Sequence, residues 1–151
     1  MASYHGEDMM GVGKRKRFML SMKKAIMKHL ADNGIKKQRV FLVGTGCSGV
    51  AMASTLSYML GVRWGFIRKK EDTNNHSWGT VHETMMHNMR DYTIAVDDFV
   101  SGGTTARTLY ESFRYDALAV GHSGPCKTKE AIYNTVNLPD IEVITPPMGD
   151  A

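Results

Sequence analysis

Short apolar runs of strand-like composition alternate with helical segments along most of this chain, and the alternation restricts its fold more than any other feature. Residues 39–43 and 92–96 are largely apolar and β-branched, and each run is followed by a glycine-bearing turn. Strands without a polar face are typical of parallel sheets that helices cover on both sides. We therefore expect a three-layer α/β/α domain with a mostly parallel central sheet, whose ligand binds at the carboxyl ends of the strands.

The same kinds of pattern locate the other elements. Apolar residues spaced three and four apart over residues 15–32 predict a helix that Asn33 and Gly34 end. We expect further helices over residues 50–60, 81–89, 105–113 and 128–136, and further strands over residues 62–67, 117–120 and 141–144. Residues 68–79 are polar and without periodicity, and a connection of that length in a compact domain is typical of a functional lid.

The composition fits one globular domain. The chain has 151 residues, of which 42% are hydrophobic and 23% charged, enough to bury a core. It has no apolar run near the roughly 20 residues of a membrane-spanning helix, and residues 1–13 lack the apolar stretch of a signal peptide, so we expect a cytoplasmic protein without a membrane partner. Cys47 and Cys126 belong to no paired motif, and we expect both to be reduced thiols.

The positive charge is concentrated at the N-terminus. Residues 1–39 carry ten Lys or Arg against three acids, whereas residues 40–151 carry nine against twelve. The run Lys14, Arg15, Lys16 and Arg17 could attract nucleic acid or another polyanion. We favour a solvated helix face, because no helix-turn-helix pattern, zinc-finger spacing or aromatic RNA-binding signature accompanies the basic residues.

The turn after the first strand has the sequence Gly-Thr-Gly-Cys-Ser-Gly over residues 44–49. This spacing is the dinucleotide-binding fingerprint, and it suits any phosphate because glycine lets a ligand approach the backbone at a helix start. The acid that should hold a ribose at the end of the next strand is replaced by Arg68, Lys69 and Lys70. NAD is therefore disfavoured, which leaves an NADP site and simple tight packing of strand on helix as alternatives.

The turn after residues 92–96 carries more chemistry. Adjacent carboxylates at Asp97 and Asp98 repel each other and lose hydration at a strand end, which favours a ligand with hydroxyl groups such as a ribose diol. The Ser, Gly and Thr residues at 101–105 offer hydroxyls and backbone N–H groups at a helix start, which suits a terminal phosphate. Together they match a ribose 5-phosphate unit, and a plain helix cap is the alternative.

Residues 96–105 resemble the phosphoribosyl diphosphate (PRPP) binding motif of type I phosphoribosyltransferases, with a bulkier residue at Phe99 and a glycine at Gly102 where Thr or Ala is more common. The resemblance spans residues 40–120, and residues 66–79 look most like the orotate phosphoribosyltransferase branch. It implies transfer of ribose 5-phosphate from PRPP to a nitrogen of a nucleobase, with Mg²⁺ and release of pyrophosphate. Family members commonly form homodimers.

The resemblance also implies roles for individual residues. Asp97 and Asp98 would hold the ribose hydroxyls. The cradle of the 5-phosphate would be Ser101, Gly102, Gly103, Thr104 and Thr105. Contacts to pyrophosphate and its Mg²⁺ would come from Thr45, Gly46, Cys47 and Ser48, and cations that neutralise the leaving group from Arg68, Lys69, Lys70 and His76.

The acceptor base stays open. Orotate enzymes place a basic residue after the fourth core strand, where this chain has His122 and Ser123, which would either touch the base or only pack in a loop. The expected division is a basic helix and possible hood over 1–38, a PRPP-binding core over 39–123 and a final helix and strand over 124–151. A regulatory protein that keeps the fold, senses PRPP or a nucleotide and binds nucleic acid is the main alternative.

His82 and His87 flank an acid at Glu83 in an arrangement that resembles a zinc-protease motif. Histidines five residues apart point in different directions on a helix, so we expect no metal site there.

Overall fold

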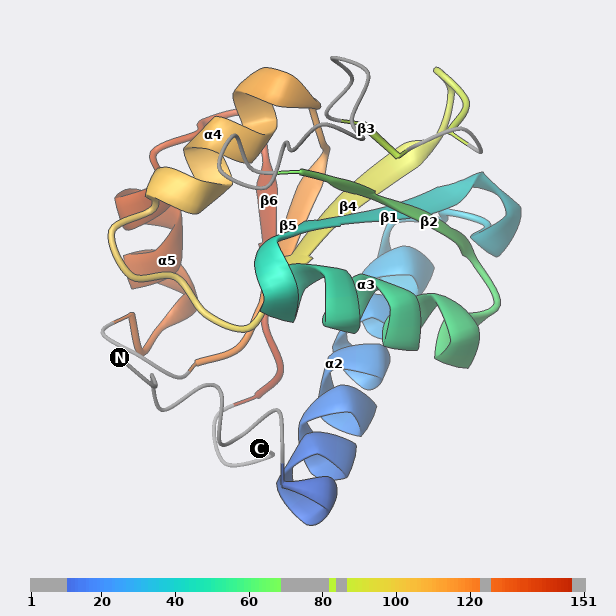
Figure 1. Ribbon diagram of the computed structural model, residues 1–151, viewed down its shortest axis with the longest axis horizontal. Helices are drawn as coiled ribbons and strands as arrows, with labels where there is room; N and C mark the ends of the chain where they lie inside the picture. The colour runs from blue at the N-terminus through green and yellow to red at the C-terminus, as the bar shows by residue number, and fades with distance from the viewer. Residues whose placement is uncertain (1–10, 69–81, 84–86, 123–125, 148–151) are drawn as a thin grey trace.

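A computed structural model describes residues 11–68, 82–83, 87–122 and 126–147, and the statements below concern these residues (Figure 1). They form a six-stranded sheet in the order β3-β2-β1-β4-β5-β6. The strands are β1 (Val40–Thr45), β2 (Arg63–Ile67), β3 (His82–Glu83), β4 (Tyr92–Asp97), β5 (Ala117–Val120) and β6 (Glu142–Ile144). Every pairing is parallel except that of β2 with the edge strand β3.

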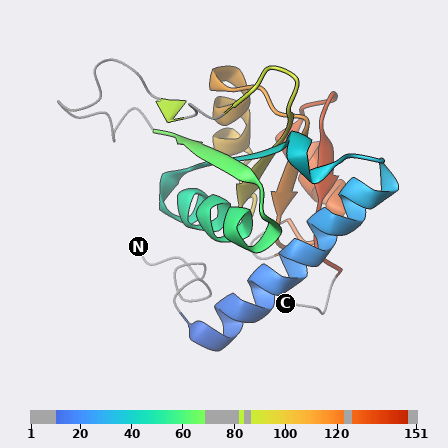
Figure 2. The ribbon, with the colours of Figure 1, turned by 90° about the vertical axis from the view of Figure 1, so that its right-hand side faces the viewer.

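Helices cover both faces of the sheet, which confirms the predicted three layers. Helices α2 (Val12–Asp32) and α3 (Gly46–Leu60) lie on one face, and α4 (Thr104–Ser112) and α5 (Lys129–Val136) lie on the other, as Figure 2 shows from the side. Side chains along β1 alternate between the layers: Val40 and Leu42 pack toward α2 and α3, while Phe41 and Val43 pack toward α4 and α5. A short 3-10 turn, η1 (Lys37–Arg39), leads into β1.

The basic N-terminal helix belongs to the core. One side of α2 buries apolar residues spaced three and four apart, namely Phe18, Met19, Met22, Ile26 and Leu30. The exposed side carries most of the cations, including Lys16 and Arg17. This division is the amphipathic pattern of a surface helix, and it agrees with a solvated basic face. No helix among the described residues is long and apolar enough to cross a membrane.

The order of the strands determines where a ligand can bind. From β1 the chain moves outward to β2, then returns past β1 to β4 and continues to β5 and β6 in the opposite direction. The turns that follow β1 and β4 therefore open side by side at the carboxyl edge of the sheet. In parallel α/β sheets this reversal point creates the crevice that holds the ligand.

The predicted helix over 81–89 is wrong where the structure describes it. His82 and Glu83 pair antiparallel with Ile67 and Phe66 as β3. Farther on, the Asn88 N–H donates to the Asp91 carboxylate at 2.7 Å and closes a turn. Pairing with the free edge of β2 and this side-chain hydrogen bond stabilise the observed conformation more than the local sequence favours a helix, because tertiary contacts can override secondary-structure propensity. The remaining residues of that segment, 81 and 84–86, lie outside the described residues.

His87 packs against two aromatic side chains. Its ring lies edge-on to Phe41 and Phe113, with centroids 4.9 and 4.7 Å away, and its Nε2 is 3.0 Å from Thr93 Oγ1. Burial lowers the pKa of His87. Within the described ranges, no three His, Cys, Asp or Glu residues gather where they could hold a metal ion.

Candidate active site

A cavity of about 900 Å³ opens at the carboxyl edge of the sheet, between the turns after β1 and β4. Its walls include all the sequence-predicted residues of both turns: Thr45, Gly46, Cys47, Ser48, Asp97, Asp98, Ser101, Gly102, Gly103, Thr104 and Thr105. Helix α2 contributes Arg15 from the side. The fold thus brings the two turns, about fifty residues apart in the chain, to one concave site.

The two acids of the β4 turn lie at the floor of this cavity. Asp98 is only 6% exposed. The Asp97 carboxylate accepts hydrogen bonds from the Asp98 N–H at 2.9 Å and from Ser48 Oγ at 3.2 Å. The Asp98 carboxylate accepts from the Phe99 N–H at 3.0 Å. Neither acid forms an ion pair with any cation that the structure describes.

The pKa of Asp97 is raised to about 8, mainly by burial and in addition by the side-chain hydrogen bond and the charge of the neighbouring Asp98. Removing a carboxylate from water disfavours its charged form, and a second carboxylate nearby adds to the effect. Perturbed acids of this kind in a cleft are typical of functional sites. A ligand that donates hydroxyl hydrogens or brings positive charge would relieve both penalties.

The turn between β4 and α4 presents an anion-binding backbone. Gly103 begins the helix with φ +83°, a left-handed conformation that glycine adopts without strain. Arg107 fastens the turn by donating to Gly102 O at 3.1 Å and to Thr135 O at 2.8 Å. Ser101, Gly102 and Thr104 are exposed to solvent. The N–H groups of the first turn of α4 therefore point into an open, supported pocket, which favours a phosphate.

The turn after β1 is much tighter than the sequence suggested. Helix α3 starts at Gly46, the residue directly after the strand, so residues 44–49 form no separate loop. A Cβ on Gly44 would lie 2.1 Å from Gly49 O, which shows that the glycine at residue 44 lets α3 pack against β1. The packing alternative therefore explains Gly44, whereas a Cβ on Gly49 would meet nothing closer than 3.4 Å.

Within that turn, Thr45 is turned away from the cavity. Its buried hydroxyl donates to Ile67 O at 2.7 Å, so only its backbone is available to a ligand. Gly46 and Ser48 are partly exposed and Cys47 is exposed, all at the N-terminus of α3. This is a second place where unpaired N–H groups of a helix start face the cavity.

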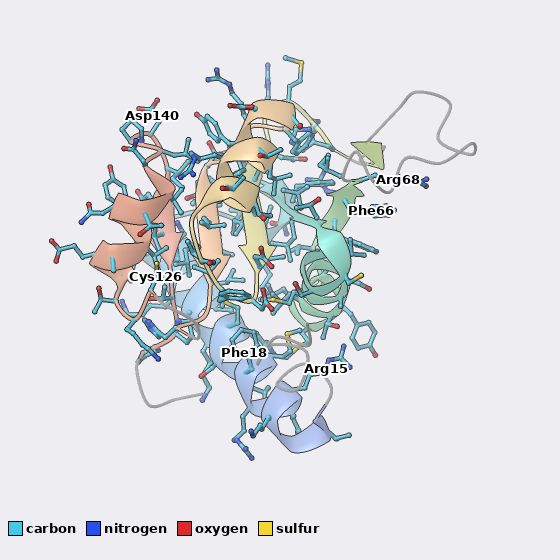
Figure 3. The ribbon with its side chains drawn as sticks, turned by 60° about the vertical axis from the view of Figure 1, so that its left-hand side comes forward. Arg15, Phe18, Phe66, Arg68, Cys126 and Asp140 are labelled. Atoms are coloured by element: carbon cyan, nitrogen blue, oxygen red, sulfur yellow. The ribbon has the colours of Figure 1, made fainter. Side chains whose placement is uncertain are left out.

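Of the predicted lid cations, the structure describes Arg68, which does not line the cavity. The Arg68 guanidinium lies 5.9 Å from the centroid of the Phe66 ring, beside β2 and away from the cavity (Figure 3). Lys69, Lys70 and His76 lie outside the described residues. His122 Nε2 donates to Pro146 O and does not line the cavity, and Ser123 lies outside the described residues.

Sequence reasoning missed Arg15 as a site residue. Its Nη2 donates to Thr55 Oγ1 on α3 at 2.9 Å, and its side chain lines the cavity. The basic run at residues 14–17 is visible in the sequence, and Arg15 is three and four residues before the buried Phe18 and Met19, so helical spacing places it on the buried side of α2. Only the tertiary structure shows that this side of α2 meets α3 beside the cavity.

The donor atoms in the cavity suit Mg²⁺. Asp97, Asp98 and Ser48 supply hard oxygen ligands within one small region. Magnesium in proteins is usually bound by one or two carboxylates together with substrate phosphates and water, without a complete protein cage. The residues present therefore fit a Mg²⁺ ion that enters with a phosphorylated ligand.

No protein-family model and no curated protein sequence matches this chain. Solved structures do match. Orotate phosphoribosyltransferase from Aeropyrum pernix has a TM-score of 0.61 at 13% identity, covering 89% of this chain and 71% of its own. Adenine phosphoribosyltransferase from Trypanosoma brucei has a TM-score of 0.56 at 11% identity, covering 90% of this chain and 68% of its own. Purine phosphoribosyltransferase from Pyrococcus horikoshii has a TM-score of 0.51 at 16% identity, covering 91% of this chain and 90% of its own.

These matches define the class: the chain has the type I phosphoribosyltransferase fold. The similar structures include orotate, adenine and purine phosphoribosyltransferases, and their TM-scores range from 0.50 to 0.61. The fold therefore agrees with the family predicted from residues 96–105 and does not single out the orotate branch.

Proposed function

We propose that this chain is a PRPP-dependent phosphoribosyltransferase, which transfers ribose 5-phosphate to a ring nitrogen of a nucleobase and releases pyrophosphate. The observation that carries the proposal is one cavity in which paired, unneutralised carboxylates adjoin the open N-terminus of α4. The fold supports it, since the similar Trypanosoma brucei enzyme was solved with AMP, pyrophosphate and ribose-5-phosphate.

In this proposal, Asp97 and Asp98 accept hydrogen bonds from the ribose hydroxyls, which would stabilise their buried charge. The 5-phosphate would bind to the hydroxyls and N–H groups of Ser101, Gly102, Gly103, Thr104 and Thr105. A phosphate at a helix N-terminus gains from several backbone donors and from the helix dipole. The rigid link through Arg107 would hold these donors in place before the ligand arrives.

The pyrophosphate would bind on the other side of the acids, at the N-terminus of α3. Gly46, Cys47 and Ser48 would contribute there, and Thr45 through its backbone. A Mg²⁺ ion held between the substrate oxygens and Asp97 or Asp98 would supply positive charge to the leaving group. On the resemblance alone, Arg68, Lys69, Lys70 and His76 are proposed to add further neutralisation.

In the proposed reaction, the protein forms no covalent bond with the substrate. The bond from C1 of the ribose to the pyrophosphate oxygen breaks, the bond from C1 to the base nitrogen forms, and that nitrogen loses its proton. Positive charge develops on the ribose while negative charge leaves with pyrophosphate. Positioning both reactants and stabilising these charges in a site that excludes water account for the rate enhancement.

The test is pyrophosphate release from PRPP and Mg²⁺ with a panel that contains orotate, adenine, guanine, hypoxanthine and uracil. We expect release with one base or one class of bases, and none with Asp97→Asn combined with Asp98→Asn. PRPP binding without release for any base would instead support the regulatory protein, with its basic helix free for nucleic acid. Binding of NADP with indifference to PRPP would support the dinucleotide alternative.

Three further parts of the proposal rest on the resemblance. We propose that the protein acts in cytoplasmic nucleotide metabolism, as a homodimer, and that residues from 1–38 or 124–151 form a hood over the base. Size-exclusion chromatography with light scattering would test the dimer. The base panel described above would separate an orotate enzyme from a purine enzyme.

A further inference from the structure

Arg15 is the cationic residue that α2 places in the wall of the active-site cavity. Among the described residues that line this cavity, Asp97 and Asp98 carry the negative charges and Arg15 carries the positive charge. Its neighbours Lys16 and Arg17 have the same kind of charge on the same helix but are exposed and do not line the cavity. Arg15 therefore differs from these neighbours because it is on the side of α2 that faces the cavity.

The position of α2 at the site is supported by a close aromatic contact. Phe18, one turn along the helix from Arg15, is 9% exposed and fills the space beside Gly121. A Cβ on Gly121 would lie 2.5 Å from Phe18 Cε2, so glycine is needed there for the ring to fit. Gly121 N–H in turn donates to Asp98 O at 3.0 Å. Figure 3 shows Arg15 and Phe18 on the stretch of α2 that lies beyond the carboxyl ends of the strands.

Arg15 lies on the α3 side of the acids. Its guanidinium is held by Thr55 Oγ1, which is on the same face of α3 as Ala51 and Ser48, since these residues are spaced three and four apart. Ser48 bonds to Asp97, and Ala51 lines the cavity. The α4 phosphate cradle is on the opposite side of Asp97. Arg15 is therefore on the α3 side of the acids and separated from the proposed 5-phosphate site, although Thr55 is about 13 Å along α3 from Gly46.

We infer that Arg15 is a substrate-binding residue that holds the pyrophosphate group of the donor and of the product. The inference rests on the proposed function, because it takes the ribose orientation from it. With the 5-phosphate at α4 and the hydroxyls at the acids, C1 and its diphosphate lie toward α3, where Arg15 is the described cation. One of the five N–H donors of Arg15 is used by Thr55, and a planar guanidinium matches phosphate oxygens in pairs.

A purely structural role makes a different prediction. If Arg15 only fastens α2 to α3 through Thr55, its loss lowers stability and affects every ligand alike. If Arg15 holds pyrophosphate, its loss weakens pyrophosphate selectively and leaves ribose 5-phosphate unchanged. Pyrophosphate and ribose 5-phosphate are the two parts of the donor, so measuring the binding of each one tests each end of the site on its own.

The experiment measures the dissociation constants of pyrophosphate with Mg²⁺ and of ribose 5-phosphate, each by calorimetry, for wild type, Arg15→Gln, Arg15→Lys and Arg17→Gln. We expect Arg15→Gln to weaken pyrophosphate roughly tenfold or more, as for loss of hydrogen bonds to a charged group, with ribose 5-phosphate within about twofold of wild type. Arg15→Lys should lie between, because it keeps the charge and loses the paired geometry. Arg17→Gln removes the same charge from the exposed side and should change neither constant by more than about twofold.

Pyrophosphate affinity that is unchanged in Arg15→Gln would overturn the inference, and so would equal losses for both ligands. If Arg15→Gln does not fold, the same comparison of pyrophosphate and ribose 5-phosphate affinities is made with Arg15→Lys. If wild-type protein binds neither ligand, the proposed function fails and the inference fails with it. If wild type binds both and Arg15→Gln is indistinguishable from it, only the inference fails.

Discussion

The turns after β1 and β4 occupy equivalent places in the sheet and use glycine for different purposes. After β1, the helix follows the strand without a break, and Gly44 allows the backbone of the strand to approach the helix backbone at Gly49. After β4, residues 98–103 form an open turn in which Gly103 reverses the chain at φ +83°. A glycine-rich motif at a strand end can thus serve packing or ligand access, and its letters alone do not distinguish the two.

The largest effect should come from the packing turn. Gly44→Ala would place a Cβ 2.1 Å from Gly49 O, a backbone atom that cannot move without displacing α3. We expect a loss of about 3 kcal/mol or more in the free energy of unfolding, at the upper end of the cost of overpacking. Gly13→Ala in α2 is the control, since its Cβ meets nothing closer than 3.6 Å. Urea unfolding of both variants measures the difference, and equal stabilities would show that α3 does not pack as described.

The next effect concerns the ligand turn. PRPP with Mg²⁺ at a hundredfold excess over its dissociation constant should stabilise wild type by about 2.7 kcal/mol. For a chain of this size, the melting temperature should rise by roughly 5 to 10 °C. The double variant Asp97→Asn with Asp98→Asn should fold and lose this rise, because the ribose contacts are gone.

Asp140→Asn provides the matched control for the acid variants. Asp140 is exposed in the connection between α5 and β6, far from the cavity (Figure 3). Thermal melts with and without PRPP and Mg²⁺ should show the full ligand effect in this variant. A full ligand effect in the double Asn variant as well would mean that the acids do not bind the ribose.

A smaller effect should separate two adjacent glycines in the ligand turn. Gly103→Ala forces a left-handed backbone on alanine and places a Cβ 2.7 Å from Thr135 O, so we expect a loss of about 2 kcal/mol in the free energy of unfolding. Gly102→Ala meets nothing within 4 Å and should stay within about 0.5 kcal/mol of wild type. Chemical unfolding of both variants measures the difference in their free energies of unfolding, and equal losses in the two variants would refute this prediction.

The last effect is a pH dependence of the stability of the unliganded protein. The raised pKa of Asp97, about 8, means that the folded state binds a proton that the unfolded state has already released above its ordinary value of 3.8. The stability contributed by this group therefore falls as the pH rises through this window. Asp97→Asn lacks the effect, so its stability advantage over wild type should grow between about pH 5.5 and 8.

Two histidines change the pH dependence of stability in the opposite direction, and the comparison must cancel their contribution. Burial lowers the pKa values of His29 and His87, so their contribution to stability falls as the pH drops below their ordinary value of 6.5. Both histidines are present in wild type and in Asp97→Asn, and the difference between the two melting curves cancels them. Parallel curves across the pH range would show that the carboxyl of Asp97 titrates normally.

Most elements were predictable because they depend on local pattern. The strand β4 and the helix α3 appear in the sequence as a short β-branched run and a breaker-free stretch, and each was predicted to within a few residues at the ends. The segment around His82 was predicted wrongly because its conformation depends on the edge of β2, which is fifteen residues away in the chain. A local pattern carries no information about such a partner.

The sequence by itself determined the alternation of strands and helices, the acids at the end of β4 and the glycine-bearing start of α4, because each follows from a few consecutive residues. The tertiary structure decided the order of strands, the contact between Gly44 and Gly49, and the placement of the Arg15 side of α2 at the cavity. The physical reason is that these features depend on how separate elements pack. The backbone approach of a helix to a strand, and the angle between two helices, are determined by side chains far apart in the chain.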